Sequence, residues 1–344
     1  MAEKERIRHF DTLKGIAIIL VVVHHVFGYN DTIIDQMLES LRMPLFVLVS
    51  GIFLSFRRGF WVLIVKKFNR YILPLLLFSL LYATIHDIFL ADINLTYIKT
   101  RIYSYCINLS LSNANEPLWF LKMLFFLCII TYGIEKIMPF KSRILKLAIV
   151  IIICTAFAYL VADFDPLHHQ TRLSVKIFNS KVPSAIFMLP IYYFAYLYKD
   201  FFLKPPSKKL LLAAAPIALV IWCLSARDAA MYYTAVADFP YPLLLIAQFA
   251  AVYFCFAVAY SIGRVPVISY FGQYSLVILC THSTVQLILN FIIKLNNEIV
   301  EFAIVMITAP ILIYIFTRYL PHFTAQKELI KVNDNGKIRI NFSD

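Results

Sequence analysis

The sequence predicts an all-α fold: a polytopic membrane bundle of about ten transmembrane helices, with the N- and C-termini in the cytoplasm. Hydrophobic residues make up 61% of the 344 residues and charged residues only 15%, and the mean hydropathy is +0.76. Soluble proteins are about 45–50% apolar and about 25% charged. A soluble globular enzyme is therefore excluded.

Apolar stretches of roughly 17–25 residues mark spanning helices. The ten predicted spans are 12–29, 43–56, 69–89, 117–135, 147–162, 184–198, 210–226, 240–261, 272–293 and 299–317. Two of them, 43–56 and 184–198, are short. Pro44 suits the first turn of its span, where a missing N–H is no loss, whereas Pro74 inside the third span predicts a kink.

The distribution of cations fixes the orientation of these spans. With the N-terminus inside, the cytoplasmic segments hold 23 of the 32 Lys and Arg residues, and the outer segments hold 8. Cytoplasmic loops carry the excess of Lys and Arg in membrane proteins. The net charge of +12 is therefore mainly a signal of topology, and no nucleic-acid partner is expected.

The chain is predicted to form one transmembrane domain, 1–320, followed by a short polar cytoplasmic tail, 321–344. No window of 20–50 residues repeats along it. The first span has no small-residue cleavage pattern and carries charged residues, so it is a helix of the mature protein and not a signal peptide. Eight glycines and six scattered cysteines exclude a Gly-rich nucleotide loop and a disulfide scaffold.

Ionisable groups inside a span are costly and indicate function. Lys14 and His25 are eleven residues apart, which is three helical turns plus about 20°, so they share one face with a rise of roughly 16 Å. His24 points about 100° away from that face. Asp11 is spaced to pair with Lys14 but lies roughly 21 Å from His25 along the helix. The alternative is a structural His25, satisfied by a neighbouring helix.

A second histidine, His282, lies in the ninth span, about 12 Å along the helix from Tyr274 and at a depth similar to that of His25. In the outer loop 163–169, carboxylates and imidazoles are close together in the chain. Their spacing is not that of a specific metal site, and no metal is predicted.

Cations cluster at the cytoplasmic mouth near Lys14. Their simplest explanation is anchoring at the membrane surface. These residues are Arg57, Arg58, Lys66, Lys67 and Arg70. A second polar group is expected at helix ends on the outer side. It consists of Arg42, Glu116, Trp119 and Lys122.

Five short segments follow one another along the chain: Asp11-x-x-Lys14-Gly15 with His25; Arg42-Met43-Pro44-Leu45-Phe46 onward to Ser50-Gly51; Lys67-Phe68-Asn69-Arg70 with Pro74; Pro117-Leu118-Trp119-Phe120-Leu121; and Gly272-x-x-Ser275 onward to His282. Together they resemble the motifs of the acyltransferase-3 family of membrane acyltransferases. The resemblance covers most of 7–320. Lys14 and Lys67 stand where arginine is common in the family, and a charged Lys122 is a departure from the fourth-span motif.

The resemblance implies transfer of an acyl group, commonly acetyl, from coenzyme A to a carbohydrate hydroxyl, often one destined for the bacterial surface. It implies His25 as the catalytic residue and a location in the bacterial cytoplasmic (inner) membrane. The expected partners are acyl-CoA, a carbohydrate or glycolipid acceptor and membrane lipid, and a homo-oligomer is compatible with the sequence. Acetyl-CoA would be the donor substrate, with no permanently bound cofactor.

The residues supply a compatible chemistry. Lys14, Lys67 and Arg70 can bind the phosphates of coenzyme A. A neutral His25 can take the proton of the acceptor hydroxyl as it attacks the thioester, or can form a transient acyl-histidine. Supporting roles are expected for several further residues. These are Asp11, Arg42, Ser50, Trp119 and His282, with Ser50 and His282 as donors to the developing oxyanion.

Other classes of membrane protein fit part of this pattern. A transporter or flippase for a glycan or small anion also has about ten helices and intramembrane charge, but no inverted repeat is visible. A structural membrane subunit would tolerate replacement of His25. Two further acyltransferase patterns are unmatched: no Asn precedes either span histidine suitably, and Asp31 follows His25 by six residues, not the required five.

Overall fold

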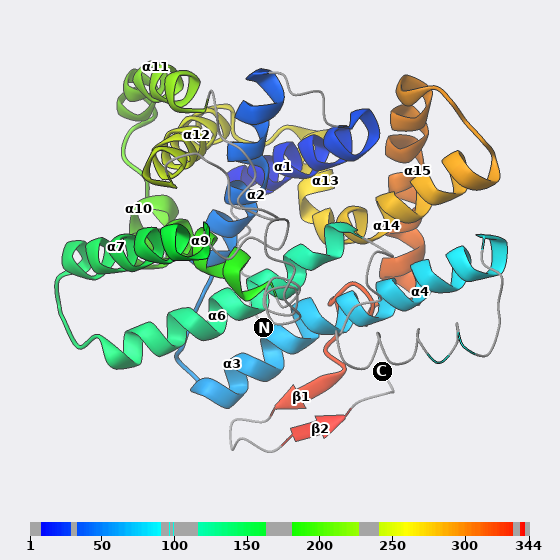
Figure 1. Cartoon of the computed structure of the whole chain (residues 1–344), viewed down its shortest axis with the longest axis horizontal. Helices are drawn as coiled ribbons and strands as arrows, with labels where there is room; N and C mark the ends of the chain where they lie inside the picture. The colour runs from blue at the N-terminus through cyan, green and yellow to red at the C-terminus, as the bar shows by residue number, and fades with distance from the viewer. Residues whose placement is uncertain are drawn as a thin grey trace.

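The computed structural model describes residues 8–28, 33–90, 116–162, 181–226, 241–332 and 338–340, together with Thr96 and Lys99. Nearly all of this chain is helical (Figure 1). The elements are α1 (Arg8–Phe27), α2 (Ile33–Ile52), α3 (Phe60–Lys67), η1 (Phe68–Ile72), α4 (Leu73–Leu90), η2 (Glu116–Leu118), α6 (Trp119–Ile137), α7 (Arg143–Ala162), α9 (Val182–Leu197), α10 (Lys199–Leu203), α11 (Lys208–Ser225), α12 (Tyr241–Ile262), α13 (Pro266–Gln273), α14 (Ser275–Leu287), η3 (Ile288–Ile292), α15 (Glu298–Tyr319), β1 (Ile330–Val332) and β2 (Ile338–Ile340).

The prediction of an all-α polytopic bundle is confirmed, and each of the ten predicted spans overlaps with a helix. In the described part of the chain, seven helical segments are long and apolar enough to cross a membrane by length and composition. The other three predicted spans are α2, α6 and α9. The first two carry three charged residues each in every 18-residue window, and α9 has 16 residues.

The burial of the spanning helices separates the centre of the bundle from its rim. Buried residues form 56% of the spanning window of α1 and 61% of that of α12, but only 17% for α7 and 28% for each of α11 and α15. The last three lie at the edge of the molecule in Figure 1, where exposed apolar side chains can face lipid. The helix that carries His25 is therefore in the core.

The second span differs from its prediction. Helix α2 begins at Ile33, ten residues before the predicted start of 43–56. Pro44 is consequently its twelfth residue and not part of its first turn, and Arg42 lies within the helix instead of at its end. The polar residues of 33–42 hid this extension, because hydropathy alone does not detect a helix that buries polar groups against other helices.

Helices α3 and α4 form one continuous segment joined by the π-turn η1, immediately before Pro74. Pro74 has no N–H to donate to the carbonyl of Arg70, and its ring crowds that carbonyl. The wider π-turn relieves this conflict, and the Leu73 N–H bonds to the Phe68 carbonyl. A π-bulge is a recognised cause of helix kinks, so the irregularity predicted for Pro74 is found one turn earlier.

Two glycines bring α1 and α13 into close contact. A Cβ at Gly272 would lie 1.7 Å from the Asp11 carbonyl oxygen, and one at Gly15 would lie 1.9 Å from the Ile268 carbonyl oxygen. Only glycine allows this approach between backbones. The Thr12 hydroxyl adds hydrogen bonds to the Gly263 carbonyl at 2.7 Å and to the Ser269 hydroxyl at 2.8 Å. The crossing fixes α1 against the chain that leads into α14.

The predicted polar tail contains a short antiparallel hairpin, β1–β2. The buried Asn69 side chain accepts from the backbone N–H groups of Leu329 and Ile330 and donates to the Ile330 carbonyl at 2.7 Å. Nearby, Phe323 packs against Phe78 and Phe316. The tail therefore folds back onto η1, between Lys67 and Arg70.

Candidate active site

His25 and His282 lie next to each other, with His282 buried and His25 half-buried. His25 is in the last turn of α1, His282 is in the middle of α14, and their ring centres are 5.1 Å apart with a 48° angle between the planes. The similar depth predicted for His282 is thus present in the structure. The glycine crossing of α1 and α13 accounts for this pairing, because α13 leads directly into α14.

The hydrogen bonding of His282 gives its two ring nitrogens different roles. Nδ1 lies 2.9 Å from the Ile278 carbonyl oxygen, which can only accept, so Nδ1 carries the proton. Nε2 is then unprotonated in the neutral ring. The side chain is 1% exposed, and within the described residues Nε2 has no hydrogen-bond partner.

A polar network encloses the end of α1 that carries His25. Gln286, one turn after His282, donates to the His25 backbone carbonyl at 2.8 Å and to Glu301 Oε1 at 2.9 Å. Asn290 donates to the same carboxylate at 3.2 Å. The last four carbonyls of a helix lack partners within it, so Gln286 caps one of them and holds the His25 turn against α14 and α15.

Gln286 and Glu301 were not predicted as site residues. Glu301 is 4% exposed and lies in the first turn of α15. The sequence signal for Glu301 was an acidic residue inside the predicted span 299–317. The signal for Gln286 was its spacing of four residues from His282, which places both on one face of the helix.

Arg42 and Glu39 form a buried pair on α2. Arg42 Nη2 lies 3.4 Å from Glu39 Oε1, and both side chains are buried, with exposed fractions of 6% and 5%. Arg42 is within electrostatic range of the His25 ring. It therefore supplies a positive charge within range of His25 from inside helix α2, and not from a helix end as predicted.

The predicted pair of Lys14 and Asp11 is present, with 2.9 Å between Lys14 Nζ and Asp11 Oδ1. Asp11 is buried, whereas the Lys14 side chain is 22% exposed. Lys14 is therefore held by an ion pair and partly exposed in the first half of α1, the helix whose last turn carries His25.

Lys67 and Arg70 lie on a different part of the bundle from Lys14. They belong to α3 and η1, which pack on α6 and β1, whereas α1 packs mainly on α13, α2, α14 and α12. Lys67 is buried with its Nζ 5.3 Å from the centre of the Tyr71 ring, and Arg70 is exposed. The structure thus separates Lys14 on α1 from the other two predicted phosphate-binding cations, Lys67 on α3 and Arg70 on η1.

A family model described as an acyltransferase domain matches residues 7–318. The protein belongs to the acyltransferase-3 family. Family membership and the apolar helices together make it an integral membrane acyltransferase. No curated protein matches the chain. No solved structure matches it either.

Two of the residues predicted to support catalysis in this acyltransferase, Trp119 and Ser50, lie on α6 and α2. Trp119 begins α6, and Lys181 Nζ lies 5.6 Å from the centre of its ring. The preceding turn η2 packs on α14, the helix of His282. Ser50 is half-buried on α2, about 12 Å along the helix from Arg42. Its hydroxyl makes no hydrogen bond within the described chain.

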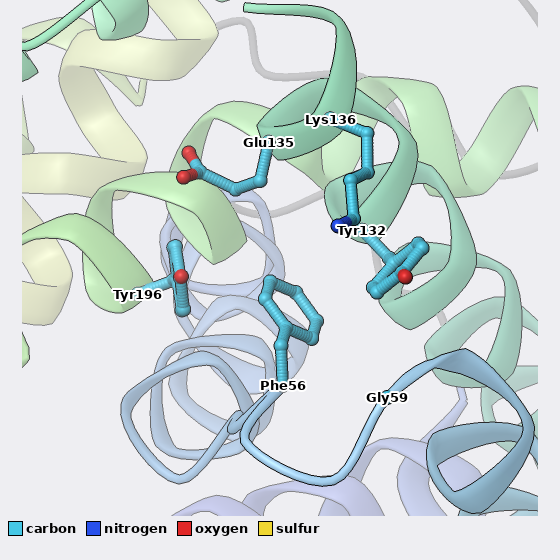
Figure 2. Close-up of a pocket in the computed structure, with 6 residues that line it drawn as sticks. All are labelled: Phe56, Gly59, Tyr132, Glu135, Lys136 and Tyr196. Atoms are coloured by element: carbon cyan, nitrogen blue, oxygen red, sulfur yellow. The ribbon is translucent and has the colours of Figure 1, made fainter. Parts of the chain in front are cut away.

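A pocket of about 240 Å³ opens at the ends of α6 and α9, on the side predicted to be cytoplasmic. Figure 2 shows Tyr132, Glu135 and Lys136 from α6 facing Tyr196 of α9 and Phe56 of the turn after α2. The centre of the Phe56 ring lies 5.2 Å from the ring centres of both Tyr132 and Tyr196. The acyltransferase therefore has an aromatic pocket with a cation at its edge.

Glu135 in this pocket is part of an ion pair between helices. Its carboxylate accepts from Lys146 Nζ of α7 at 3.0 Å and from the Tyr193 hydroxyl of α9. It thus ties α6, α7 and α9 together beside the pocket.

Metal ligands are absent from the described site. No group of three or more His, Cys, Asp or Glu residues in the described part of the chain is arranged to hold a metal ion. The loop 163–169 lies outside the described residues.

Proposed function

We propose that this acyltransferase transfers an acetyl group from acetyl-CoA, bound from the cytoplasm, to a hydroxyl of a surface or exported carbohydrate or glycolipid in the bacterial cytoplasmic membrane. The observation that carries the proposal is the pair of histidine rings 5.1 Å apart between α1 and α14, with Arg42 in electrostatic range of His25. An intramembrane base within range of a positive charge suits attack by a hydroxyl on a thioester.

His25 would act as the general base. The acceptor oxygen forms a bond to the thioester carbonyl carbon while a ring nitrogen of His25 takes the hydroxyl proton. The tetrahedral intermediate then collapses, the carbon–sulfur bond breaks, and the His25 imidazolium returns the proton to the thiolate. The products are the acetyl ester and free coenzyme A. Arg42 would stabilise the negative charge of the intermediate.

The donor would bind with its phosphates near the inner surface and its pantetheine arm directed along α1. Lys67, Arg70 and Lys14 provide the positive charge, and Lys14 shares a helix face with His25 about 16 Å away. The pocket of Figure 2 suits the adenine ring, since aromatic side chains stack on bases. Phe60 contacts Tyr132 of the pocket, and Lys67 follows about 10 Å along the same helix.

The test is incubation of the purified protein with acetyl-CoA labelled in the acetyl group and glycan extracted from the cell envelope. Transfer of label to glycan, with release of free coenzyme A in equal amount, is the expected result. A carrier would instead move glycan across vesicle membranes without covalent change. Absence of transfer to any envelope glycan or glycolipid, from folded protein that binds acetyl-CoA, would overturn the proposed acceptor class.

A further inference from the structure

We infer that His282 is a positioning residue for His25: its Nε2 accepts a hydrogen bond from a ring N–H of His25, so that the other His25 nitrogen is the base. This inference rests on the proposed function and assigns a role within the same site. It also changes the role expected for His282, because an unprotonated nitrogen cannot donate to an oxyanion.

The first support is the fixed tautomer of His282. The Ile278 carbonyl oxygen, one helical turn earlier in α14, lies 2.9 Å from His282 Nδ1 and keeps the proton on that nitrogen. Nε2 is therefore an acceptor buried in the core with no partner in the described structure. Buried polar atoms are rarely left without a hydrogen bond, and those that are need an explanation.

The second support is the distance between the rings. Two imidazoles joined by an N–H···N hydrogen bond of about 2.9 Å have ring centres roughly 5 Å apart, and those of His25 and His282 are 5.1 Å apart. A 180° rotation of the His25 ring about its Cβ–Cγ bond exchanges carbons for nitrogens within the same volume. The ring can thus present an N–H to His282 without moving α1.

The third support is the set of other polar and charged groups around His25. Within the described chain, the His25 ring makes no hydrogen bond to a carboxylate. The other groups that act on it are the His24 ring, with its centre 5.1 Å away, and the Arg42 cation. Glu301 accepts from Gln286 and Asn290. Gln286 also donates to the His25 backbone carbonyl, and its contact with His25 is therefore to the helix end and not to the ring. The acceptor that orients a catalytic histidine, usually a carboxylate, is here the neutral His282.

The arrangement gives a consistent path for protons. When His25 takes the hydroxyl proton, its second N–H still donates to His282 Nε2 and spreads the new positive charge over two rings. His282 keeps its own proton on Nδ1 throughout. The acceptor proton leaves on the coenzyme A thiol, so both histidines return to their starting state.

Two substitutions at His282 separate this role from simple packing. In His282→Gln, the amide oxygen can occupy the position of Nε2 and still accept a hydrogen bond, whereas His282→Leu fills a similar volume without an acceptor. The Leu variant is expected to lower kcat about 10²- to 10⁴-fold with little change in the KM for acetyl-CoA, and the Gln variant to recover much of that loss. Thr284→Val, on the opposite face of α14, is the matched control and is expected to retain activity.

A spectroscopic measurement on the full chain does not depend on these variants. In protein labelled with ¹⁵N-histidine, the His282 Nε2 resonance should have the shift of an unprotonated nitrogen that accepts a hydrogen bond, and should move in His25→Ala. An unchanged His282 resonance in that variant, or equal kcat in the Leu variant and the wild type, would overturn the inference. If the His25→Ala variant turns over normally, the proposed function fails together with the inference. If only the His282 measurements differ from the expected results, the inference alone fails.

Discussion

Gln286 on α14 donates a hydrogen bond of 2.8 Å to the backbone carbonyl of His25 on α1, and thereby joins the end of the first helix to a buried carboxylate of the last. Gln286→Leu should lower kcat roughly tenfold or more, because losing a hydrogen bond worth about 1–3 kcal/mol frees the His25 turn. Steady-state kinetics of the purified variant would measure this effect.

The matched control for that change is Gln248→Leu on α12. The buried Gln248 amide has no hydrogen-bond partner for either atom in the described chain. Removing unpaired polar atoms from a core is neutral or stabilising, so this variant should keep its activity. Equal losses in both variants would show that α1 does not depend on the Gln286 contact.

His25→Ala should leave a folded, membrane-inserted protein that does not transfer acyl groups. The side chain is at the end of α1 and only half-buried, so its loss costs little packing. The measurement is label transfer from acetyl-CoA, with thermal unfolding in detergent as the check on folding. Normal turnover by a well-folded variant would refute the assignment of His25 as the base.

Removing positive charge at Lys14 or Arg70 should raise the KM for acetyl-CoA several-fold and leave kcat nearly unchanged. Each cation contributes a charge-assisted contact to phosphate, and such contacts weaken as salt screens them. Lys14→Gln and Arg70→Gln are the variants, with the exposed Lys66→Gln as the control beside Lys67. Unchanged donor affinity in both variants at low salt would contradict the phosphate-binding role.

Gly272→Ala should prevent the close packing of α13 on α1. The new methyl group would lie 1.7 Å from the Asp11 carbonyl oxygen, so the helices must separate, at a cost above about 3 kcal/mol. Gly133→Ala on α6 is the control, because no atom lies within 4 Å of its added Cβ. That variant should gain about 0.5–1 kcal/mol from helix propensity. Thermal unfolding of both proteins in detergent compares them, and similar stabilities would contradict the crossing.

Asn69→Ala should release the C-terminal hairpin from η1. Three hydrogen bonds to the backbone of Leu329 and Ile330 are lost from a buried side chain, each worth about 1 kcal/mol net. Limited proteolysis should then cleave the chain after α15 faster than in the wild type. An unchanged cleavage rate would mean that the apolar contacts of Phe323 are sufficient to hold the tail.

Much of the fold follows from hydropathy, because a spanning helix needs an apolar stretch of fixed length. This explains why all ten predicted spans overlap with helices. The same reasoning placed the start of α2 too late, since its first turns bury Glu39 and Arg42 against each other instead of exposing apolar side chains. The docking of the hairpin after α15 has no strong sequence signal, because the residue that anchors its first strand, Asn69, is far away in the chain.

The candidate site also combines relations that the sequence predicts with relations that only the packing of helices creates. Helical periodicity alone put Lys14 and His25 on one face and paired Lys14 with Asp11, because these relations are local to one helix. The meeting of His25 with His282, the cap from Gln286 and the charge of Arg42 depend on how α1, α2, α14 and α15 cross. One of the contacts that positions them, between α1 and α13, depends on Gly15 and Gly272, whose effect appears only once the two helices pack together.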